Sequence, residues 1–329
     1  MAKPLHIAIS PPLAPWSSWS LALVLATLAA CGSGGEEDSS DSATDSATEL
    51  PLHRESSASN WLALAAGYEH TCGIVESSEE TGGDSAGELV CWGKESNLTH
   101  ENPTDPPAGI YSSLDSGGDF SCALREDGQI RCWGDSSHGK ASPPTELVAQ
   151  ITTGFEHSCA LGLEGSLNCW GWADGYDISP PAGAHRELSS GLNFSCAISE
   201  EGEASCWGAD HAGQTSSPEE AMTRVTAGGD HACGILDGGA ITCWGGTLPE
   251  QLAHPDGTFV ELSAGSRHTC AVASDATIHC WGDDSLGQSS PPSGSFRAVT
   301  SGASHSCAIR EDGVAVCWGG NIAGQSLPP

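Results

Sequence analysis

The sequence predicts an all-β protein, a seven-bladed β-propeller built from seven repeats of about 37 residues and preceded by a signal peptide and a disordered tether. Three observations lead to this prediction. A cysteine recurs at intervals of 37 residues from Cys122 to Cys307, a Cys-Trp-Gly tripeptide begins ten residues after each of these cysteines, and apolar and polar residues alternate between the two cysteines. Self-similarity at such a period is typical of propellers and other repeat folds.

The composition excludes several classes of protein before any motif is considered. The chain has 329 residues, with 11 Lys and Arg against 43 Asp and Glu, and a net charge of −32. Because binding to nucleic acid and to anionic membranes depends on clustered basic residues, we expect no nucleic-acid partner and no direct contact with lipid headgroups. A hydrophobic content of 38% is enough for a folded core.

Residues 1–30 are predicted to be a lipoprotein signal peptide. Residues 21–30 form an apolar run that is too short to cross a bilayer, and Lys3 is the only charged residue before position 36. The run ends in Leu-Ala-Ala-Cys at residues 28–31, which resembles the bacterial lipobox, so that Cys31 would carry the lipid. An ordinary signal peptide with a chance cysteine is the alternative, and a polar stretch at residues 6–20 departs from the lipobox pattern.

Residues 31–57 are predicted to be a disordered tether rich in serine, glycine and acidic residues. Such a segment has almost no apolar surface to bury, so it cannot offset the entropy that it would lose on folding. With Cys31 lipidated, the protein would lie in the bacterial cell envelope, anchored in the outer membrane or at the cell surface. Without the lipid it would be secreted.

Residues 58–329 are predicted to form the propeller. The first cysteines of its seven units are Cys72, Cys122, Cys159, Cys196, Cys233, Cys270 and Cys307, and the second cysteines, each followed by Trp-Gly, are Cys91, Cys132, Cys169, Cys206, Cys243, Cys280 and Cys317. A row of small sheets must close on itself or leave its edges exposed, and a tryptophan in every unit fits a closed ring. Residues 61–66 are predicted to be a spare strand that pairs with the last unit and fastens the ring.

Each unit is predicted to contain a β-hairpin between its two cysteines. In the second unit, apolar and polar residues alternate on both sides of a Glu-Asp-Gly tip at residues 126–128. Glycine in the last position of a three-residue loop adopts a left-handed conformation without steric cost. This loop pairs Leu124 with Ile130 and Cys122 with Cys132. The tip glycine recurs in four further units, while one unit has Ala276; the glycines are Gly165, Gly202, Gly239 and Gly313.

The paired cysteines are predicted to form seven structural disulfides, one per unit. Directly opposed residues of a hairpin have Cβ atoms about 4.5–5.5 Å apart, a distance that a disulfide can span after a small adjustment. Reduced thiols and a metal site are the alternatives. Zinc sites use closely spaced cysteines, whereas six units space them by ten residues. The histidine two residues before the first cysteine is also replaced in two units, by Phe120 and Phe194, so we expect no metal.

The unit resembles the regulator of chromosome condensation repeat. It combines Gly-x-x-His-Ser-Cys-Ala, Asp-Gly, Cys-Trp-Gly and a final Gly-Gln pair, which is present at residues 213–214, 287–288 and 324–325. The resemblance covers about residues 61–329 and implies a seven-bladed propeller. Cysteines replace aliphatic or small positions of the family pattern. The Gly-Gln pair becomes Gly139-Lys140 in unit two, Tyr176-Asp177 in unit three and Glu250-Gln251 in unit five, and is missing from unit one, which predicts altered connections there.

Residues that depart from the repeat are the best candidates for function, because recurring residues serve the blade. Unit three reads Cys-Trp-Gly-Trp-Ala-Asp-Gly-Tyr, which adds Trp172, Asp174 and Tyr176 to the loop after the hairpin. Tyrosine and tryptophan are enriched in binding hot spots, so we predict a binding site there. The alternative is that Trp172 and Tyr176 pack against a neighbouring blade. No hydrolase, phosphate-binding or zinc-protease motif is present, so we expect no catalytic residue and no cofactor.

We therefore expect a surface-anchored bacterial lipoprotein whose propeller is a non-catalytic, monomeric binding module for an extracellular protein or a glycan. The resemblance offers a guanine-nucleotide exchange factor as an alternative, because that activity is associated with the founding member of the family. Secretion, the acidic surface and the cysteines argue against it, and the secreted type II β-lactamase-inhibitory proteins are a precedent for binding alone. An enzyme on a propeller scaffold is the remaining alternative.

Overall fold

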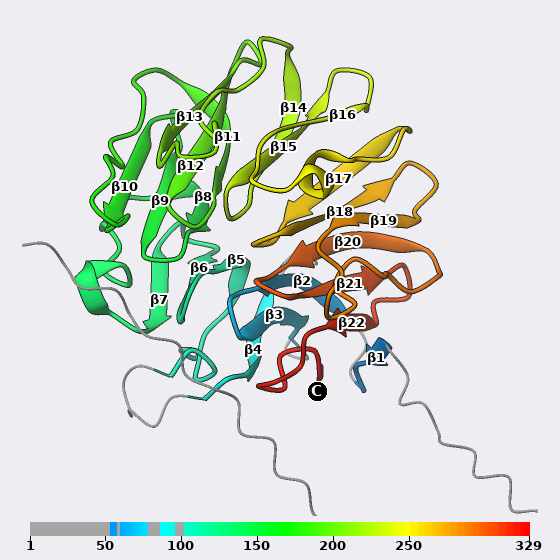
Figure 1. Ribbon diagram of the computed structural model, residues 1–329. Helices are drawn as coiled ribbons and strands as arrows, with labels where there is room; N and C mark the ends of the chain where they lie inside the picture. Colours follow the sequence, from blue (N-terminus) through cyan, green and yellow to red (C-terminus); the bar gives the residue numbers. More distant parts are fainter. Residues whose placement is uncertain (1–52, 58–59, 78–85, 96–101) are drawn as a thin grey trace, which may run out of the picture. The chain divides into compact units, whose positions relative to one another are not determined.

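The protein is described by a computed structural model in which residues 53–57, 60–77, 86–95 and 102–329 are placed (Figure 1). The predicted signal peptide, Cys31 and most of the predicted tether lie outside the described residues. All described residues belong to one unit of the chain, which spans Glu49–Pro329. Among them, no helix is long and apolar enough to cross a membrane.

The described chain forms seven antiparallel blades that follow one another in sequence order, so that the first blade lies beside the last (Figure 1). Each blade has an inner, a middle and an outer strand. The inner strands are β2 (Trp61–Ala66), β5 (Tyr111–Ser116), β8 (Val148–Thr153), β11 (His185–Ser190), β14 (Met222–Ala227), β17 (Phe259–Ala264) and β20 (Phe296–Ser301).

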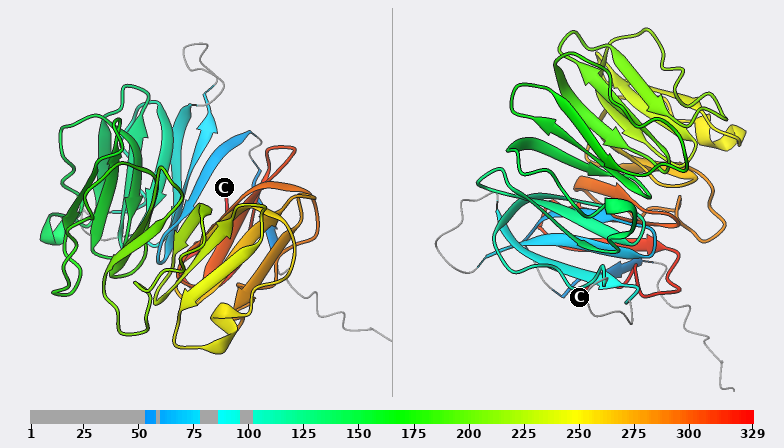
Figure 2. Two further views of the ribbon diagram at one scale, coloured as in Figure 1. Left: turned by 90° about the horizontal axis from the view of Figure 1, so that it is seen from above. Right: turned by 90° about the vertical axis from the view of Figure 1, so that its left-hand side faces the viewer.

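The middle strands are β3 (His70–Glu76), β6 (Phe120–Arg125), β9 (His157–Gly162), β12 (Phe194–Ser199), β15 (His231–Leu236), β18 (His268–Ala273) and β21 (His305–Arg310). The outer strands are β4 (Gly87–Gly93), β7 (Ile130–Gly134), β10 (Leu167–Gly171), β13 (Ala204–Gly208), β16 (Ile241–Gly245), β19 (Ile278–Gly282) and β22 (Ala315–Gly319). Two short 3-10 helices, η1 (Ser137–Gly139) and η2 (Pro249–Leu252), lie in the loops between blades. Figure 2 shows the strands of the blades from two further sides, and one backbone pairing between β4 and β5 joins the sheets of blades one and two.

The hairpin register within the blades confirms the prediction from the sequence. Cys122 faces Cys132 and Leu124 faces Ile130, and the same register recurs in the other blades. All seven predicted disulfides are present, with the two Cα atoms of each pair 4.0–4.1 Å apart. The tip glycines have positive φ angles, and Ala276 adopts the same conformation at φ 67°. The ten-residue spacing of the cysteines in six blades thus reflects one local hairpin geometry.

A ring of seven glycines closes the propeller where the inner strands end. A Cβ atom added to any of them would lie 2.1–2.8 Å from the carbonyl oxygen of the corresponding glycine in the next blade, and the last one, Gly302, would meet Gly67 of the first. Only a residue without a side chain fits at this position. The ring consists of Gly67, Gly117, Gly154, Gly191, Gly228, Gly265 and Gly302.

Two expectations about the N-terminal part of the propeller were wrong. Residues 61–66 are not a spare strand, because β2 pairs with β3 and is the inner strand of the first blade. The strand that pairs with the last unit is β1 (His53–Glu55), which is antiparallel to β22 and gives blade seven a fourth strand. Residues 53–55, which the prediction assigned to the tether, are therefore a strand of the propeller.

Candidate functional site

Several recurring elements of the repeat serve the contact between blades. The indole N–H of each Cys-Trp-Gly tryptophan donates a hydrogen bond of 2.9–3.1 Å to a backbone carbonyl in the loop that follows the preceding blade. In three blades the glutamine of the Gly-Gln pair is buried, and its side-chain oxygen accepts a hydrogen bond from a backbone N–H of the same loop at 2.8 Å. This bond holds in place the glutamine's own backbone carbonyl, which accepts the indole N–H; the residues are Gln214, Gln288 and Gln325.

Lys140 replaces this glutamine in blade two, and ion pairs instead of a side-chain amide hold its backbone in place. Its ammonium group is buried, lies 2.7 Å from both Asp135 and Glu156, and stands over the ring of Phe120. Burial alone would lower the pKa of Lys140, but hydrogen bonds and charges from the two carboxylates outweigh it and raise the pKa. The Lys140 carbonyl still accepts the indole N–H of Trp170. The altered Gly-Lys pair is therefore structural.

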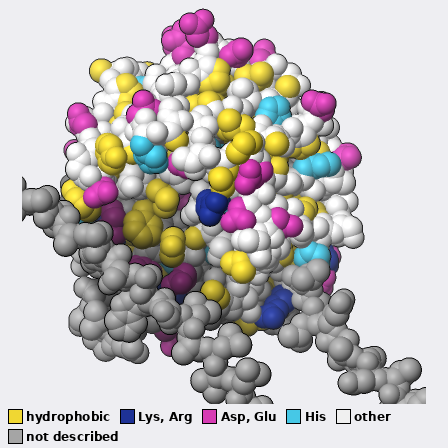
Figure 3. Space-filling view, viewed as in Figure 1, with side chains coloured by type: hydrophobic (Ala, Val, Ile, Leu, Met, Phe, Trp, Pro, Cys, Tyr) yellow, Lys and Arg dark blue, Asp and Glu magenta, His cyan; other side chains and the backbone are white. Residues whose placement is uncertain are grey.

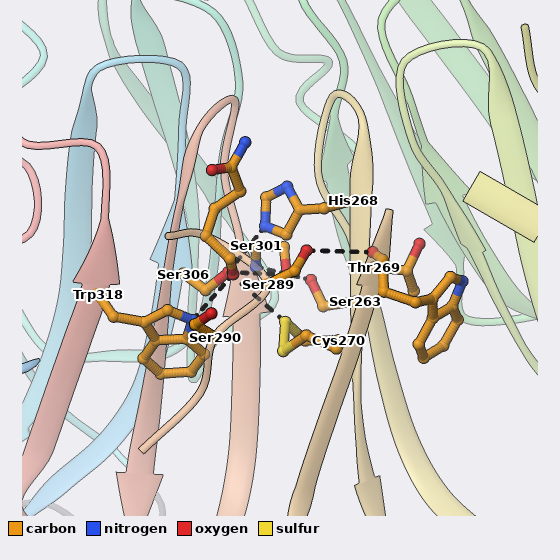
Figure 4. The surroundings of a disulfide bond; sticks show 12 residues. Ser263, His268, Thr269, Cys270, Ser289, Ser290, Ser301, Ser306 and Trp318 are labelled. Atoms are coloured by element: carbon orange, nitrogen blue, oxygen red, sulfur yellow. Dashed lines mark hydrogen bonds between the residues drawn. A yellow bond between two sulfur atoms is a disulfide. The ribbon is translucent and has the colours of Figure 1, made fainter. Parts of the chain in front are cut away.

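The five histidines that precede the first cysteine form links between blades. Each is fully buried, and its Nε2 lies 2.7–2.9 Å from the hydroxyl of a serine or threonine in the next blade; the pairs are His70–Ser121, His157–Ser195, His231–Thr269, His268–Ser306 and His305–Thr71. Figure 4 shows the link from His268 to Ser306 beside Cys270. Burial lowers the pKa of these histidines to about 4 or about 3, so they are neutral at physiological pH.

The candidate site lies on one face of the propeller, which we call the turn face. It carries the turns between inner and middle strands and the loops that follow each Trp-Gly. In all seven blades the first amide after Trp-Gly bonds to a carbonyl of the turn, as Trp172 does to Glu156 at 2.8 Å. These backbone bonds hold turns and loops together, so that side chains from both are presented side by side.

Trp172 is half-exposed on the turn face, with 42% of its surface accessible. Its ring packs against His138 from η1 of blade two, with ring centroids 4.8 Å apart. Tyr176 is equally exposed, at 43%. Its backbone N–H donates a hydrogen bond to the carbonyl of buried Ala173, which closes a turn. Asp174 lies at the tip of this turn in a left-handed conformation, with φ 52°.

The structure therefore places the three predicted residues in one exposed loop but does not join the two aromatic rings. In the described part of the chain, the ring contact of Trp172 is with His138, and Tyr176 has none. The contact of Trp172 with His138 fits the packing alternative for that residue, while both aromatic side chains remain more than 40% exposed. Trp172 thus contacts the loop of the neighbouring blade, while Tyr176 is exposed on the surface of blade three.

A second aromatic group on the turn face was not predicted from the sequence. At the mouth of the central channel, Tyr68 of blade one contacts Phe155 of blade three, with ring centroids 5.3 Å apart. Blade two contributes only Gly118 between them, where a Cβ would come within 2.6 Å of the Phe155 carbonyl oxygen. Leu192 of blade four continues this apolar arc. The cavity at the mouth has a volume of about 70 Å³, enough for a few water molecules.

The signal for this arc was present in the repeat alignment. The residue after the ring glycine is large and apolar at Tyr68, Phe155 and Leu192, but small in the other four blades, at Gly118, Gly229, Ser266 and Ala303. Acidic residues follow at Glu69, Asp119, Glu156 and Asp230. Lys94 pairs with Glu69 at 2.9 Å and Asp119 at 3.4 Å. Figure 3 shows carboxylates spread over one side of the molecule, with few basic side chains among them.

Comparisons with known proteins agree with the fold. A family model described as "Regulator of chromosome condensation (RCC1) repeat" matches residues 111–140, 148–176, 186–214, 259–288 and 296–325. The structure shows that units one and five, which the model does not match, form blades as well. No curated protein sequence matches the chain.

Solved structures resemble most of the chain. The CRINKLY WD40 ectodomain of the Arabidopsis thaliana receptor kinase ACR4 is 25% identical, covers 80% of this chain and 98% of its own, and has a TM-score of 0.64. The ectodomain of the Physcomitrella patens receptor kinase CR4 is also 25% identical, covering 80% of this chain and 74% of its own, with a TM-score of 0.67. Human WBSCR16, 16% identical over 79% of this chain and 87% of its own, has a TM-score of 0.61.

Proposed function

The repeats of this chain belong to the regulator of chromosome condensation family, and from this premise we propose that the propeller binds another protein through its turn face without catalysing a reaction. The observation that carries the proposal is the set of large apolar side chains that the scaffold does not need. These side chains lie where other blades have small or polar residues; they are Tyr68, Phe155, Leu192, Trp172 and Tyr176. Tyr68, Trp172 and Tyr176 are each more than 40% exposed.

Such a group is expected of a binding site and not of a solvated surface. Exposing aromatic rings has a free-energy cost that a hydrophilic replacement would avoid, and tyrosine and tryptophan dominate the energetics of protein interfaces. The acidic residues around the channel mouth would provide a polar rim, which excludes water from the central contact and selects partners by charge. A glycan is the alternative ligand for exposed aromatic rings, and the test below separates the two.

The extracellular location is supported by the disulfides and by the relatives. Seven disulfides within one chain indicate an oxidising compartment, since cytosolic thiols are kept reduced. Two of the matching structures are ectodomains of receptor kinases. By analogy, this propeller would also meet its partner outside the cytosol.

Anchoring through a lipid on Cys31 belongs to the same proposal. The lipobox-like residues 28–31 and the serine-rich, acidic segment after them would hold the propeller at a distance from the membrane. Replacing Cys31 with serine should move the protein from the membrane fraction to the soluble fraction. Mass spectrometry that finds an unmodified N-terminus at another cleavage site would contradict lipidation.

The binding site is tested with the double variant Trp172→Ala and Tyr176→Gly. Wild-type and variant full-length chains are used as bait for chemical cross-linking in a cell-envelope extract and as probes on a glycan array. We expect the variant to lose a specific cross-linked protein, and the affinity for that protein to fall by about 2 kcal/mol or more, the usual effect of hot-spot residues. Because both side chains are half-exposed, the melting temperature should change little.

Ile322→Ala is the matched control, because Ile322 is exposed in the corresponding loop of blade seven. It should leave the cross-linked protein in place. A variant that keeps the partner but melts several degrees lower would show that Trp172 and Tyr176 are packing residues. Binding to glycans with no protein partner would move the function to carbohydrate recognition.

A further inference from the structure

We propose a second docking site on the face opposite the turn face, a groove in blade three that accepts a segment of another protein carrying a leucine-sized side chain flanked by lysine or arginine. This groove lies at the hairpin tip, where β9 ends at Gly162, whereas β9 begins at the turn face with His157. The two sites are therefore at opposite ends of the same strand. The proposal does not depend on the function proposed for the turn face.

The groove is lined by apolar and polar side chains and has a volume of about 260 Å³. Its apolar part includes Leu147, Val148, Ala160 and Leu163. Leu163 is 65% exposed and Leu147 is 49% exposed. Small-molecule sites usually measure about 300–1,000 Å³, so this groove fits one or two side chains better than a complete organic ligand.

The two leucines are departures from the repeat. At the tip position of Leu163 the other described hairpins have polar residues, namely Glu126, Glu200, Asp237, Ser274 and Glu311. At the position of Leu147, just before the inner strand, blade two also has an apolar residue, Ile110, whereas the last four units have Ala184, Ala221, Thr258 and Ser295. The hairpin folds with a polar tip in these blades, so the exposed leucines of blade three are not needed for the fold.

Gly162 keeps the groove open. The same position at the end of the middle strand carries a side chain in other blades, as in Arg125, Leu236 and Arg310. In blade three, a Cβ on Gly162 would come within 2.6 Å of the Ser166 hydroxyl oxygen, and Ser166 lines the groove. A larger residue at position 162 would therefore intrude into the groove. Gly162 leaves the space of the groove free, and Leu147 and Leu163 give it an apolar surface.

The charge of the rim selects the partner. Glu146 and Glu164 are exposed and line the groove, and none of the residues that line it is basic. The net charge of the whole chain, −32, adds a long-range attraction for cations. A segment with lysine or arginine on either side of an apolar anchor would bury that anchor between the leucines and place its charges beside the two carboxylates. An acidic segment would be repelled.

The proposal is tested by selection from a displayed library of random dodecapeptides. The library is first depleted on the Leu163→Glu chain and then selected on the wild-type chain, both full-length. Glutamate occupies this tip position in three other blades, so the hairpin should accept it. We expect enriched peptides to carry a leucine, isoleucine, methionine or phenylalanine with lysine or arginine within three residues. Their binding should weaken at least tenfold with Leu163→Glu and with Leu147→Ser.

The double variant Trp172→Ala and Tyr176→Gly is the matched control, because it alters only the turn face and should bind these peptides as the wild type does. Several results would overturn the proposal: no enriched sequence, enriched sequences without basic residues, or binding to the two leucine variants that is as strong as binding to the wild type. Loss of peptide binding in the turn-face variant would also overturn it, because the peptides would then occupy the other face. Leu147→Ser copies Ser295 of blade seven and keeps the test valid if Leu163→Glu fails to fold.

Discussion

At the scale of single residues, one side chain in each of five inner strands accepts a hydrogen bond from the backbone of the next blade. The fifth residue of the strand accepts the amide N–H of the sixth residue in the following blade, at 2.7–3.0 Å; the bonds run from Ala66 to Thr300, Thr153 to Asp115, Ala227 to Ser189, Ala264 to Thr226 and Ser301 to Ser263. In every case but one the acceptor is a hydroxyl. Only Asp115 uses a carboxylate.

Asp115 is an aspartate because the preceding blade cannot supply its acceptor. Blade one has Ala65 at the fifth position, which leaves the amide of Ser116 in blade two without a hydroxyl to bind. Asp115 fills both roles: one oxygen accepts Thr153 N–H at 2.7 Å, and the other accepts Ser116 N–H at 3.0 Å. Burial raises the pKa of Asp115 to about 6, although these hydrogen bonds lower it. The carboxylate of Asp115 in blade two thus compensates for the missing hydroxyl at Ala65 in blade one.

This coupling predicts that Asp115→Ser is destabilising and that Ala65→Ser rescues it. Serine at position 115 can still accept Thr153 N–H, but the Ser116 amide loses its partner, which should cost about 1–3 kcal/mol. A hydroxyl at position 65 restores the missing acceptor, so the double variant should recover most of the loss in urea unfolding. Equal stability of the single and double variants would show that Ser116 N–H finds another partner.

At the scale of elements, β1 is the fastening of the propeller. It covers the free edge of β22, and the residue after it adds three bonds: Ser56 N–H donates to Ala315 at 2.8 Å, while its hydroxyl accepts from Ala315 N–H and from the Trp61 indole, both at 3.1 Å. Trp61 is fully buried in the first blade. The short segment at residues 53–56 therefore ties the first blade to the last.

Deleting residues 1–59 should lower the melting temperature by several degrees, while deleting residues 1–52 should not. The longer deletion exposes the edge of β22 and removes the hydroxyl that the buried indole of Trp61 donates to, and an unsatisfied buried donor costs about 1–3 kcal/mol. In a domain of this size, each kcal/mol corresponds to about 2–4 °C. Both truncated chains are compared by calorimetry. Identical melting curves would show that the glycine ring and the blade contacts close the propeller without β1.

At the scale of the whole molecule, the buried histidines make stability depend on pH. Their pKa is about 3 or 4 in the folded protein, against 6.5 in the unfolded chain. Below pH 6.5 the unfolded chain takes up protons that the folded protein does not, so stability is greatest above pH 6.5 and declines as the pH falls toward 4. Asp115 and Glu261 act in the opposite direction, because burial raises the pKa of Glu261 to about 7 and that of Asp115 to about 6. Burial also raises the pKa of Glu187, so five histidines act against three carboxyls and outweigh them.

The chain should therefore unfold at a lower urea concentration at pH 4.5 than at pH 7.5, and a histidine-free link should reduce the difference. His157→Phe with Ser195→Ala copies the contact that already exists between Phe194 and the next blade, where the matching residue is Ala232. The lowering of the His157 pKa from 6.5 to about 4 corresponds to about 3 kcal/mol of folding stability, which the wild type loses on acidification and the variant should keep. His211→Phe, at an exposed histidine, is the control. An unchanged pH dependence in the link variant would contradict the role of His157.

The sequence by itself determined the units and what lies within them. A spacing of ten residues with a glycine at the tip leaves one favourable hairpin register, and this register alone brings each pair of cysteines together. Residues close in the chain control that geometry, so it can be predicted from one unit without its neighbours. The departures at Trp172 and Tyr176 were visible for the same reason, since each is a change within a repeated loop.

Only the tertiary structure decided which residues of different blades contact one another. The partner of residues 61–66 could not be chosen from the sequence, because an apolar strand suits the edge of the first sheet as well as that of the last. Tyr68 and Phe155 meet across Gly118, 87 positions apart in number, and Asp115 takes its second hydrogen bond because Ala65 lies in another blade. Such contacts depend on the closure of the ring, where residues distant in the chain come within hydrogen-bonding distance, and no local pattern encodes which of them will meet.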